Sequence, residues 1–181
     1  MSTINLQPVE TERLILLPMS YNMICGLVNG DNRELTNFGL KCGEEWPRPD
    51  TYDIMKFLSI SMKKKQEPSG YEIWLIAKKD GKVVIGNAGF TGPPDADGRI
   101  EIGYGIVYSE RNKRYGYESA KALIDWAKAQ NNVKKICASG VLVDNYASIR
   151  ILNKVGMEEI SRDENGIYFE MIAGHVIGLE L

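Results

Sequence analysis

Apolar residues change their spacing several times along the chain, from the alternation of a strand to the longer period of a helix. At residues 100–107 apolar residues alternate with others, a polar turn runs from Ser109 to Tyr115, and helical spacing begins after Gly116. This pattern predicts a strand, a basic turn and a helix. Six further strands are expected at 12–17, 71–78, 83–90, 135–141, 157–162 and 167–172. Helices are expected at 21–38 (two, broken near Gly30), from Asp50 or Thr51 to about Lys65, at 118–130 and at 145–154.

Two pairs of predicted strands are joined by short turns that are typical of hairpins, Asp80-Gly81 and Asn165-Gly166. The expected fold class is therefore α/β (α+β), with a mixed, mostly antiparallel sheet of about seven strands and helices on both faces. No repeat or linker interrupts the pattern. We expect residues 1–181 to form a single domain, with a core at about 11–172 and a short tail at 173–181.

Composition limits the kind of protein. A chain of 181 residues, 44% of them apolar, has the size and apolar content of one globular domain. A formal charge of −2 argues against nucleic acid or an anionic membrane as a partner. The three cysteines have no C-x-x-C spacing, and neither a signal-like segment nor a membrane-length apolar run is present. These features predict a cytoplasmic protein.

The basic turn is the first chemical signal. Arg111, Lys113 and Arg114 stand where the free amides of a helix N-terminus are expected, which is the chemistry of an anion cradle. The turn is neither a Walker loop, because no Gly-Lys-Ser/Thr follows, nor a dinucleotide loop, because Gly103 and Gly105 lie inside the strand. A ligand that carries phosphate is implied.

Residues from Arg111 to Gly116 resemble the pyrophosphate loop of the GNAT acyltransferases, Gln/Arg-x-x-Gly-x-Gly/Ala, with Arg114 in place of the first glycine. Other blocks extend the resemblance over roughly Thr11 to Ile172. In chain order they are Glu101–Tyr104, Tyr117–Ala120, Asn145–Ser148 and Lys154–Met157. Together they resemble the branch related to ribosomal-protein alanine N-acetyltransferases (RimJ/RimL-like).

This resemblance implies a GNAT-like acyl-CoA N-acyltransferase fold and acetyl-CoA as the cofactor. The strands before and after the pyrophosphate helix would splay apart, and the pantetheine arm would enter the gap. Asn145 would join the cofactor to its helix, or serve as a plain N-cap. The implied cofactor-binding residues are Ile106 and Val107 through their backbone, Arg111, Asn112, Lys113, Arg114, Tyr115, Gly116, Tyr117 and Asn145.

Acetyl transfer to an amine needs a base, a polarised carbonyl and a donor for the departing thiolate, and it needs no metal. Glu101 is the candidate base, with a solvent-facing strand residue as the alternative. At the position where many of these enzymes carry a tyrosine that acts as the general acid, this chain has Leu152. Ser148, one helical turn earlier, is therefore the candidate donor, although it also fits a local cap. Tyr104, Tyr108 and Tyr146 are further possible donors of lower weight.

The loop from Gly43 to Asp50 carries Trp46, which would either line the acceptor pocket or anchor the loop. Tyr104 is also assigned to the substrate side. The acceptor is expected to be a primary amine, either a protein N-terminus or a small molecule, and homodimer formation is left open. The alternative function is a degenerate module that binds acyl-CoA as a sensor or regulatory subunit.

Overall fold

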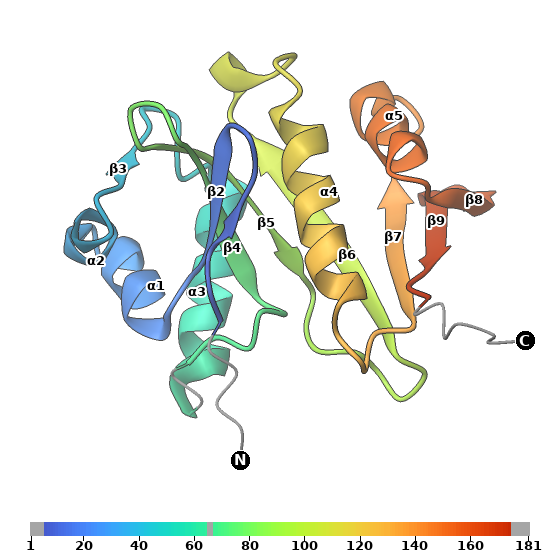
Figure 1. Ribbon diagram of the computed structural model, residues 1–181, viewed down its shortest axis with the longest axis horizontal. Coiled ribbons are helices and arrows are strands. Elements are labelled where there is room, and N and C mark those ends of the chain that lie inside the picture. Colours follow the sequence, from blue (N-terminus) through green and yellow to red (C-terminus); the bar gives the residue numbers. More distant parts are fainter. Residues whose placement is uncertain (1–5, 65–66, 175–181) are drawn as a thin grey trace, which may run out of the picture.

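The computed structural model describes residues 6–64 and 67–174 (Figure 1). Lys65, the expected end of one helix, and residues 175–181 of the expected tail lie outside the described residues. No helix within these ranges is long and apolar enough to cross a membrane.

Strands and helices occur in nearly the order that the sequence predicts. The strands are β1 (Val9–Glu10), β2 (Leu14–Pro18), β3 (Lys41–Cys42), β4 (Ile73–Lys78), β5 (Val83–Phe90), β6 (Arg99–Ile106), β7 (Lys135–Val141), β8 (Glu158–Asp163) and β9 (Gly166–Ile172). The α-helices are α1 (Tyr21–Val28), α2 (Arg33–Asn37), α3 (Pro49–Ser61), α4 (Tyr115–Lys128) and α5 (Tyr146–Lys154). Two 3₁₀ turns are η1 (Met62–Lys64) and η2 (Tyr108–Glu110).

The described strands form one sheet in the order β1-β2-β4-β5-β6-β7-β9-β8, with β3 paired to β5. All neighbours are antiparallel except β6 with β7 and β3 with β5, which confirms the mixed, mostly antiparallel sheet. Nine strands are present where about seven were expected. The additional ones, β1 and β3, have two residues each, too few to show a period of two in the sequence.

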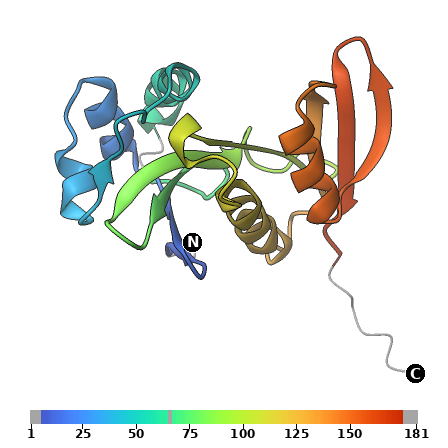
Figure 2. The same cartoon turned by 90° about the horizontal axis from the view of Figure 1, so that it is seen from above.

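Helices cover both faces of the sheet, as predicted: α4 lies on one face and α3 on the other (Figure 2). The start of α3 differs from the prediction. Arg48 is the N-cap and Pro49 the first helical residue, where a proline fits because its missing N–H would be unbonded anyway. Asp50 and Thr51, one of which was expected to cap the helix, both lie within it. Thr51 is buried, and its hydroxyl donates to Asn87 Oδ1 at 2.7 Å.

An aromatic cluster fixes α4 against the sheet. Trp126 of α4 packs edge-on against Trp74 and Tyr71, with ring centroids 5.2 and 5.4 Å apart, and Phe90 completes the group. The indole N–H of Trp74 donates to the carbonyl of Gly70 at 2.8 Å, so this buried donor is satisfied. The C-terminal half of α4 is thereby held firmly, and its N-terminus has a defined position at the end of β6.

The central strands β6 and β7 pair only at their start, from Arg99 with Lys135 to Glu101 with Cys137. Beyond Glu101, β6 continues beside β5 to Ile106, while β7 continues beside β9. The predicted splayed pair is confirmed. Figure 1 shows the two strands diverging, with α4 in front of β6 and α5 beside the end of β7.

Candidate active site

The splay leaves backbone groups of β6 without a strand partner. Val107 N donates to Ile85 O at 2.9 Å, and Val107 O accepts from Glu110 N at 3.2 Å, so both of its groups are occupied. In an antiparallel ladder, alternate residues direct their N–H and C=O to opposite sides. Ile106 therefore directs its own groups toward the gap, where its carbonyl accepts from Arg111 Nε at 3.2 Å. Of the two residues expected to contact a pantetheine arm, Ile106 is the one whose N–H faces the gap.

The turn before α4 presents a row of unbonded amides. Within the described part of the chain, no hydrogen bond occupies the backbone N–H groups of residues 112–117, and the N-cap residue Arg114 gives no side-chain cap. Asn112 and Arg114 have left-handed backbones, with φ of 62° and 68°. This geometry turns successive amides toward one side, as in an anion-binding nest. A glycine would adopt the conformation of Arg114 without strain, which explains the glycine of the resembled motif.

The three cations of the turn differ in their partners. Arg111 lies over the ring of Tyr108, 5.5 Å from its centroid, besides donating to Ile106 O. Lys113 pairs with Glu110 at 2.8 Å. The side chain of Arg114 makes neither an ion pair nor a hydrogen bond with any residue that the structure describes. Arg114 is therefore the cation of the turn that is free for a ligand.

An anchor from β2 supports the turn. Arg13 donates through Nε to Glu118 of α4 at 2.8 Å, and through Nη1 to the carbonyl of Lys113 at 3.1 Å. Thr11 donates to Glu118 Oε1 at 2.5 Å, and the guanidinium of Arg13 stacks on Tyr115. Burial acts to raise the pKa of Glu118, but the hydrogen bonds from Thr11 and Arg13 outweigh it and hold that pKa below its usual value.

This anchor was missed in the sequence, where residues 12–17 read as an ordinary core strand. The Thr-Glu-Arg-Leu start at Thr11 was the available signal, because two polar residues there can donate to a carboxylate.

Gly116 occupies the second position of α4 and has an ordinary helical backbone. A Cβ at this position would lie 3.1 Å from Ile151 Cδ1 and 3.8 Å from Ile106 Cγ1. Gly116 therefore allows close approach of α4 to α5 and β6, while the left-handed conformation falls at Arg114.

Glu101 lies at the point where β6 and β7 separate. Its Oε1 accepts from the backbone N–H of Ser139 on β7 at 3.3 Å. Past the splay, this amide has no partner on β6, so the carboxylate satisfies it. Glu101 thus joins the two diverging strands and still presents a second carboxylate oxygen beside the gap.

Tyr104 and Ser148 meet across the gap. Their hydroxyl oxygens are 2.9 Å apart, and either one can be the donor. Burial raises the pKa of Tyr104, and the hydrogen bond with Ser148 only partly offsets this. Sequence reasoning placed Ser148 as a donor and Tyr104 near the substrate, but did not pair them, because they are 44 residues apart in the sequence.

The alternation of side chains along β6 places these groups on opposite faces. Glu101 and Gly105 lie on the side of the sheet that carries α3, where a Cβ on Gly105 would come within 3.2 Å of Arg48 Nη1. Tyr104 points to the other face and meets Ser148 of α5. A carboxylate on one side of the gap and two hydroxyls on the other can exchange protons with two different partners of one reaction.

The loop before α3 is fastened to the mouth of the gap. Glu45 accepts from the backbone N–H groups of Tyr108 and Ser109, at 2.8 and 3.2 Å. Trp46 is only 3% exposed and belongs to the core, which favours the expected anchoring role over the lining of an acceptor pocket. Arg48, which sequence reasoning missed, extends from this loop to the same face of β6, near Gly105.

The remaining candidates have simpler roles. Asn145 is the N-cap of α5, accepting from Ser148 N at 3.2 Å. Tyr108 and Tyr146 are 78% and 66% exposed, so their hydroxyls lie in solvent. Leu152 is buried in the core.

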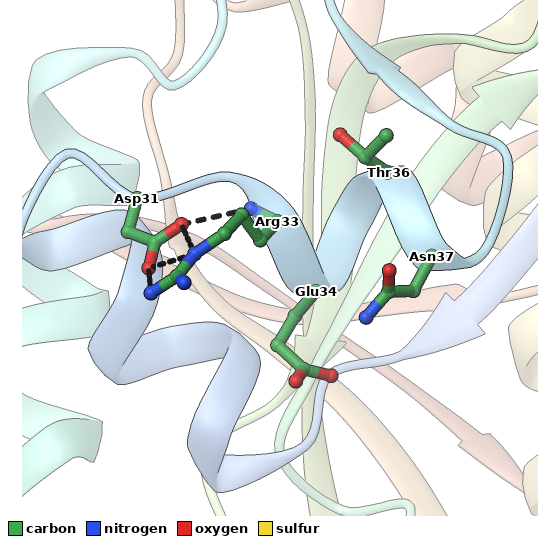
Figure 3. Close-up of a pocket in the computed structure, with 5 residues that line it drawn as sticks. All are labelled: Asp31, Arg33, Glu34, Thr36 and Asn37. Atoms are coloured by element: carbon green, nitrogen blue, oxygen red, sulfur yellow. Dashed lines mark hydrogen bonds and ion pairs between the residues drawn. The ribbon is translucent and has the colours of Figure 1, made fainter.

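A separate hollow of about 460 Å³ lies at α2 (Figure 3). Asp31 and Arg33 dominate it, and they bind each other through a fork of hydrogen bonds with the shortest at 2.6 Å. Because the charges of Asp31 and Arg33 satisfy each other, we assign this hollow no chemistry.

Comparison with known proteins agrees with this geometry. The profile described as "Acetyltransferase (GNAT) domain" matches residues 13–158. The uncharacterized N-acetyltransferase YjdG of Bacillus subtilis is 32% identical over 148 residues, which cover 82% of this chain and 88% of that protein.

Solved structures show the same fold at low identity. The ribosomal-protein-S5-alanine acetyltransferase of Vibrio fischeri superposes with a TM-score of 0.65 at 15% identity, covering 93% of this chain and 98% of that one. RimL, a ribosomal L7/L12 α-N-protein acetyltransferase solved with coenzyme A, gives a TM-score of 0.61 at 14% identity, covering 92% and 98%. The family predicted from the sequence is confirmed: the chain belongs to the acetyltransferase (GNAT) domain family.

Proposed function

We propose that this acetyltransferase moves the acetyl group of acetyl-CoA to a primary amine, by direct transfer while both are bound. The observation that carries the proposal is the two-sided arrangement at the splay. Glu101 lies on the α3 face, and the hydroxyls of Tyr104 and Ser148 lie on the α5 face. An amine that enters on the α3 side needs a carboxylate to accept its proton, and a thiol that leaves on the α5 side needs hydroxyl donors.

The residues of the turn fit coenzyme A. Six consecutive unbonded amides at residues 112–117 and the N-terminus of α4 suit a pyrophosphate. The N–H of Ile106 faces the gap, where it can donate to a carbonyl of the pantetheine arm or the thioester. The structural relative RimL was solved with coenzyme A, which supports the same choice. When bound, acetyl-CoA supplies an activated thioester carbonyl.

Glu101 would act on the amine side. Its Oε1 is held by Ser139 N, and Oε2 is available to accept a proton from the amine directly or through one water. The open space above Gly103, where a Cβ would meet no described atom within 4 Å, leaves room for the amine on the same face.

Tyr104 and Ser148 would act on the thiol side. A thiol has a reference pKa of about 8.5 and a tyrosine about 10, and burial raises the pKa of Tyr104 further. Full proton transfer from Tyr104 to the thiolate is therefore uphill. The hydroxyl pair instead stabilises the developing negative charge on sulfur by hydrogen bonding, and the proton lost by the amine balances the reaction.

A screen tests the proposal. The protein is incubated with acetyl-CoA and a panel of primary amines, including N-terminal peptides, amino sugars and polyamines, and thiol release is recorded. Release that depends on a particular amine, with an acetylated product in the mass spectrum, is the expected result. Tight binding of acetyl-CoA with no release across the panel would favour the alternative, a sensor or regulatory module.

A further inference from the structure

A groove of about 730 Å³ runs along the outer side of α4, between the β1/β2 hairpin and the end of α5. Most of its charged side chains are already paired. Arg13 is held by Glu118 at 2.6 Å, and Lys121 pairs with Asp125 at 2.5 Å. Glu12 lies on the hairpin wall. The paired residues leave little net charge along the middle of the groove.

The end of the groove nearest the anion cradle is different. Arg114 and Lys154 both line it, and neither forms an ion pair with any residue that the structure describes. The ammonium of Lys154 lies over the ring of Tyr117, 4.3 Å from its centroid. Because Tyr117 is in the first turn of α4, this cation stands beside the amides assigned to the pyrophosphate. Two cations without an ion-pair partner among the described residues therefore line the groove together with the ring of Tyr117, which lies in the first turn of α4.

The backbone supports a role for the Arg114 side chain. Arg114 holds the left-handed conformation that favours glycine, at a cost to stability. The side chain caps nothing in α4 and bonds to nothing else within the described chain. The side chain lines the groove, to which it adds a positive charge, and Lys154 lines the same groove. A glycine at this position would keep the cradle and lose the charge.

We propose that Arg114 and Lys154 bind the 3′-phosphate of coenzyme A at this end of the groove, so that the protein discriminates coenzyme A from its 3′-dephospho form. The inference rests on the proposed function only for the identity of the cofactor. The 3′-phosphate is a dianion near neutral pH, and charge-assisted hydrogen bonds from a guanidinium and an ammonium match it.

Isothermal titration calorimetry with coenzyme A and 3′-dephospho-coenzyme A tests this directly, without turnover. The parent should bind coenzyme A at least about 10-fold more tightly, the worth of one charge-assisted contact. Arg114→Gly and Lys154→Gln should each reduce that ratio, and the double variant should bring it near one, because affinity for coenzyme A falls further than affinity for the dephospho form. Lys121→Gln is the matched control, because its charge lines the same groove but is paired with Asp125; it should keep the parental ratio.

Equal affinity of the parent for the two forms would overturn the inference, as would variants that weaken both forms equally. The outcome is independent of the amine. A protein that prefers coenzyme A but acetylates nothing would contradict the proposed function and leave this inference standing. A protein that acetylates amines equally well from acetyl-CoA and from its 3′-dephospho form would support the proposed function and contradict this inference.

Discussion

Arg13 and Glu118 form an ion pair of 2.6 Å that ties the segment just before β2 to the first turn of α4. The same guanidinium holds the carbonyl of Lys113 from the side opposite the free amides. One residue thus fixes both the end of the loop and the start of the helix, so the cradle is organised before a ligand arrives. Preorganisation of this kind lowers the entropic cost of binding.

Replacement of Arg13 should therefore weaken cofactor binding more than it slows the reaction. Arg13→Ala is expected to raise the KM for acetyl-CoA about 10-fold, with kcat within a factor of about two, because the hydrogen bonds it loses hold the cradle and touch no reacting atom. Arg13→Lys keeps one charged donor and should recover part of the loss. Steady-state kinetics at saturating amine measure both effects. A fall in kcat at unchanged KM would contradict the anchoring role.

Stability should depend on pH through the carboxylates around this turn. The pKa values of both Glu118 and Glu110 lie below their usual range: burial opposes this shift, but hydrogen bonds from Thr11 and Arg13, and from Lys113 and Lys78, outweigh it. A depressed native pKa contributes stability above the unfolded pKa of about 4.3. That stability is lost as the pH falls through the lower native values.

Thermal unfolding followed between about pH 6 and pH 3 should show the effect of Glu118 directly. The parent is expected to lose stability as the pH falls below about 4.3. Glu118→Gln should have a lower Tm at pH 6 and a flatter decline, so that the two proteins converge at the acid end. Parallel curves for parent and variant would show that Glu118 does not titrate with folding.

The anion turn and the splay were both expected from the sequence, because short stretches of contiguous residues resemble the family. The turn could be predicted from local period and local charge, because a strand, a basic turn and a helix follow one another within residues 99–128. The splay also involves β7 and was expected from the family resemblance alone. The two-residue strands β1 and β3 were not predicted, because they are defined by the strands they pair with and not by their own residues.

The site's internal contacts could not be predicted in the same way. Tyr104 with Ser148 and Arg13 with Glu118 join residues 44 and 105 positions apart, and only the fold brings them together. The burial of Trp46 likewise depends on how its loop is fastened at Glu45. A single sequence records the residue types of such pairs but not their proximity.

Removal of the Tyr104 hydroxyl should slow the chemical step. Tyr104→Phe is expected to lower kcat by about 10- to 100-fold with little change in the KM for acetyl-CoA, because a donor to the thiolate acts mainly in the transition state. Ser148→Ala, which leaves the tyrosine in place, separates the two hydroxyls: the larger loss identifies the one nearer the sulfur. Parental kcat in both variants would exclude the pair from the reaction.

The strain of the left-handed backbone at Arg114 should lower the free energy of unfolding by a measurable amount. Glycine adopts φ of 68° without strain, whereas alanine at this φ has the same conformational strain as arginine. Arg114→Gly should therefore be more stable than Arg114→Ala by about 1 kcal/mol, measured by urea denaturation without cofactor. Both variants lose the same charge, so the difference isolates the backbone. Equal stability would mean that residue 114 does not hold this conformation in solution.

Glu101 has a structural bond and a proposed chemical role, and one substitution separates them. In Glu101→Gln the side-chain oxygen can still accept from Ser139 N–H, so the splay keeps its bridge and the Tm should stay within a degree or two of the parent. The amide cannot accept a proton from an amine near neutral pH, so kcat should fall about 100-fold while the Kd for acetyl-CoA is unchanged.

Glu101→Ala is the matched control, since it removes both functions and should lower stability as well as kcat. Deprotonation of the free amine also makes the rate rise with pH, so the profiles of parent and Glu101→Gln must be recorded with the same acceptor. If the glutamine variant keeps parental kcat and the same acidic limb, Glu101 serves only to satisfy Ser139 at the splay. The amine would then lose its proton to water, and catalysis would rest on positioning the two substrates.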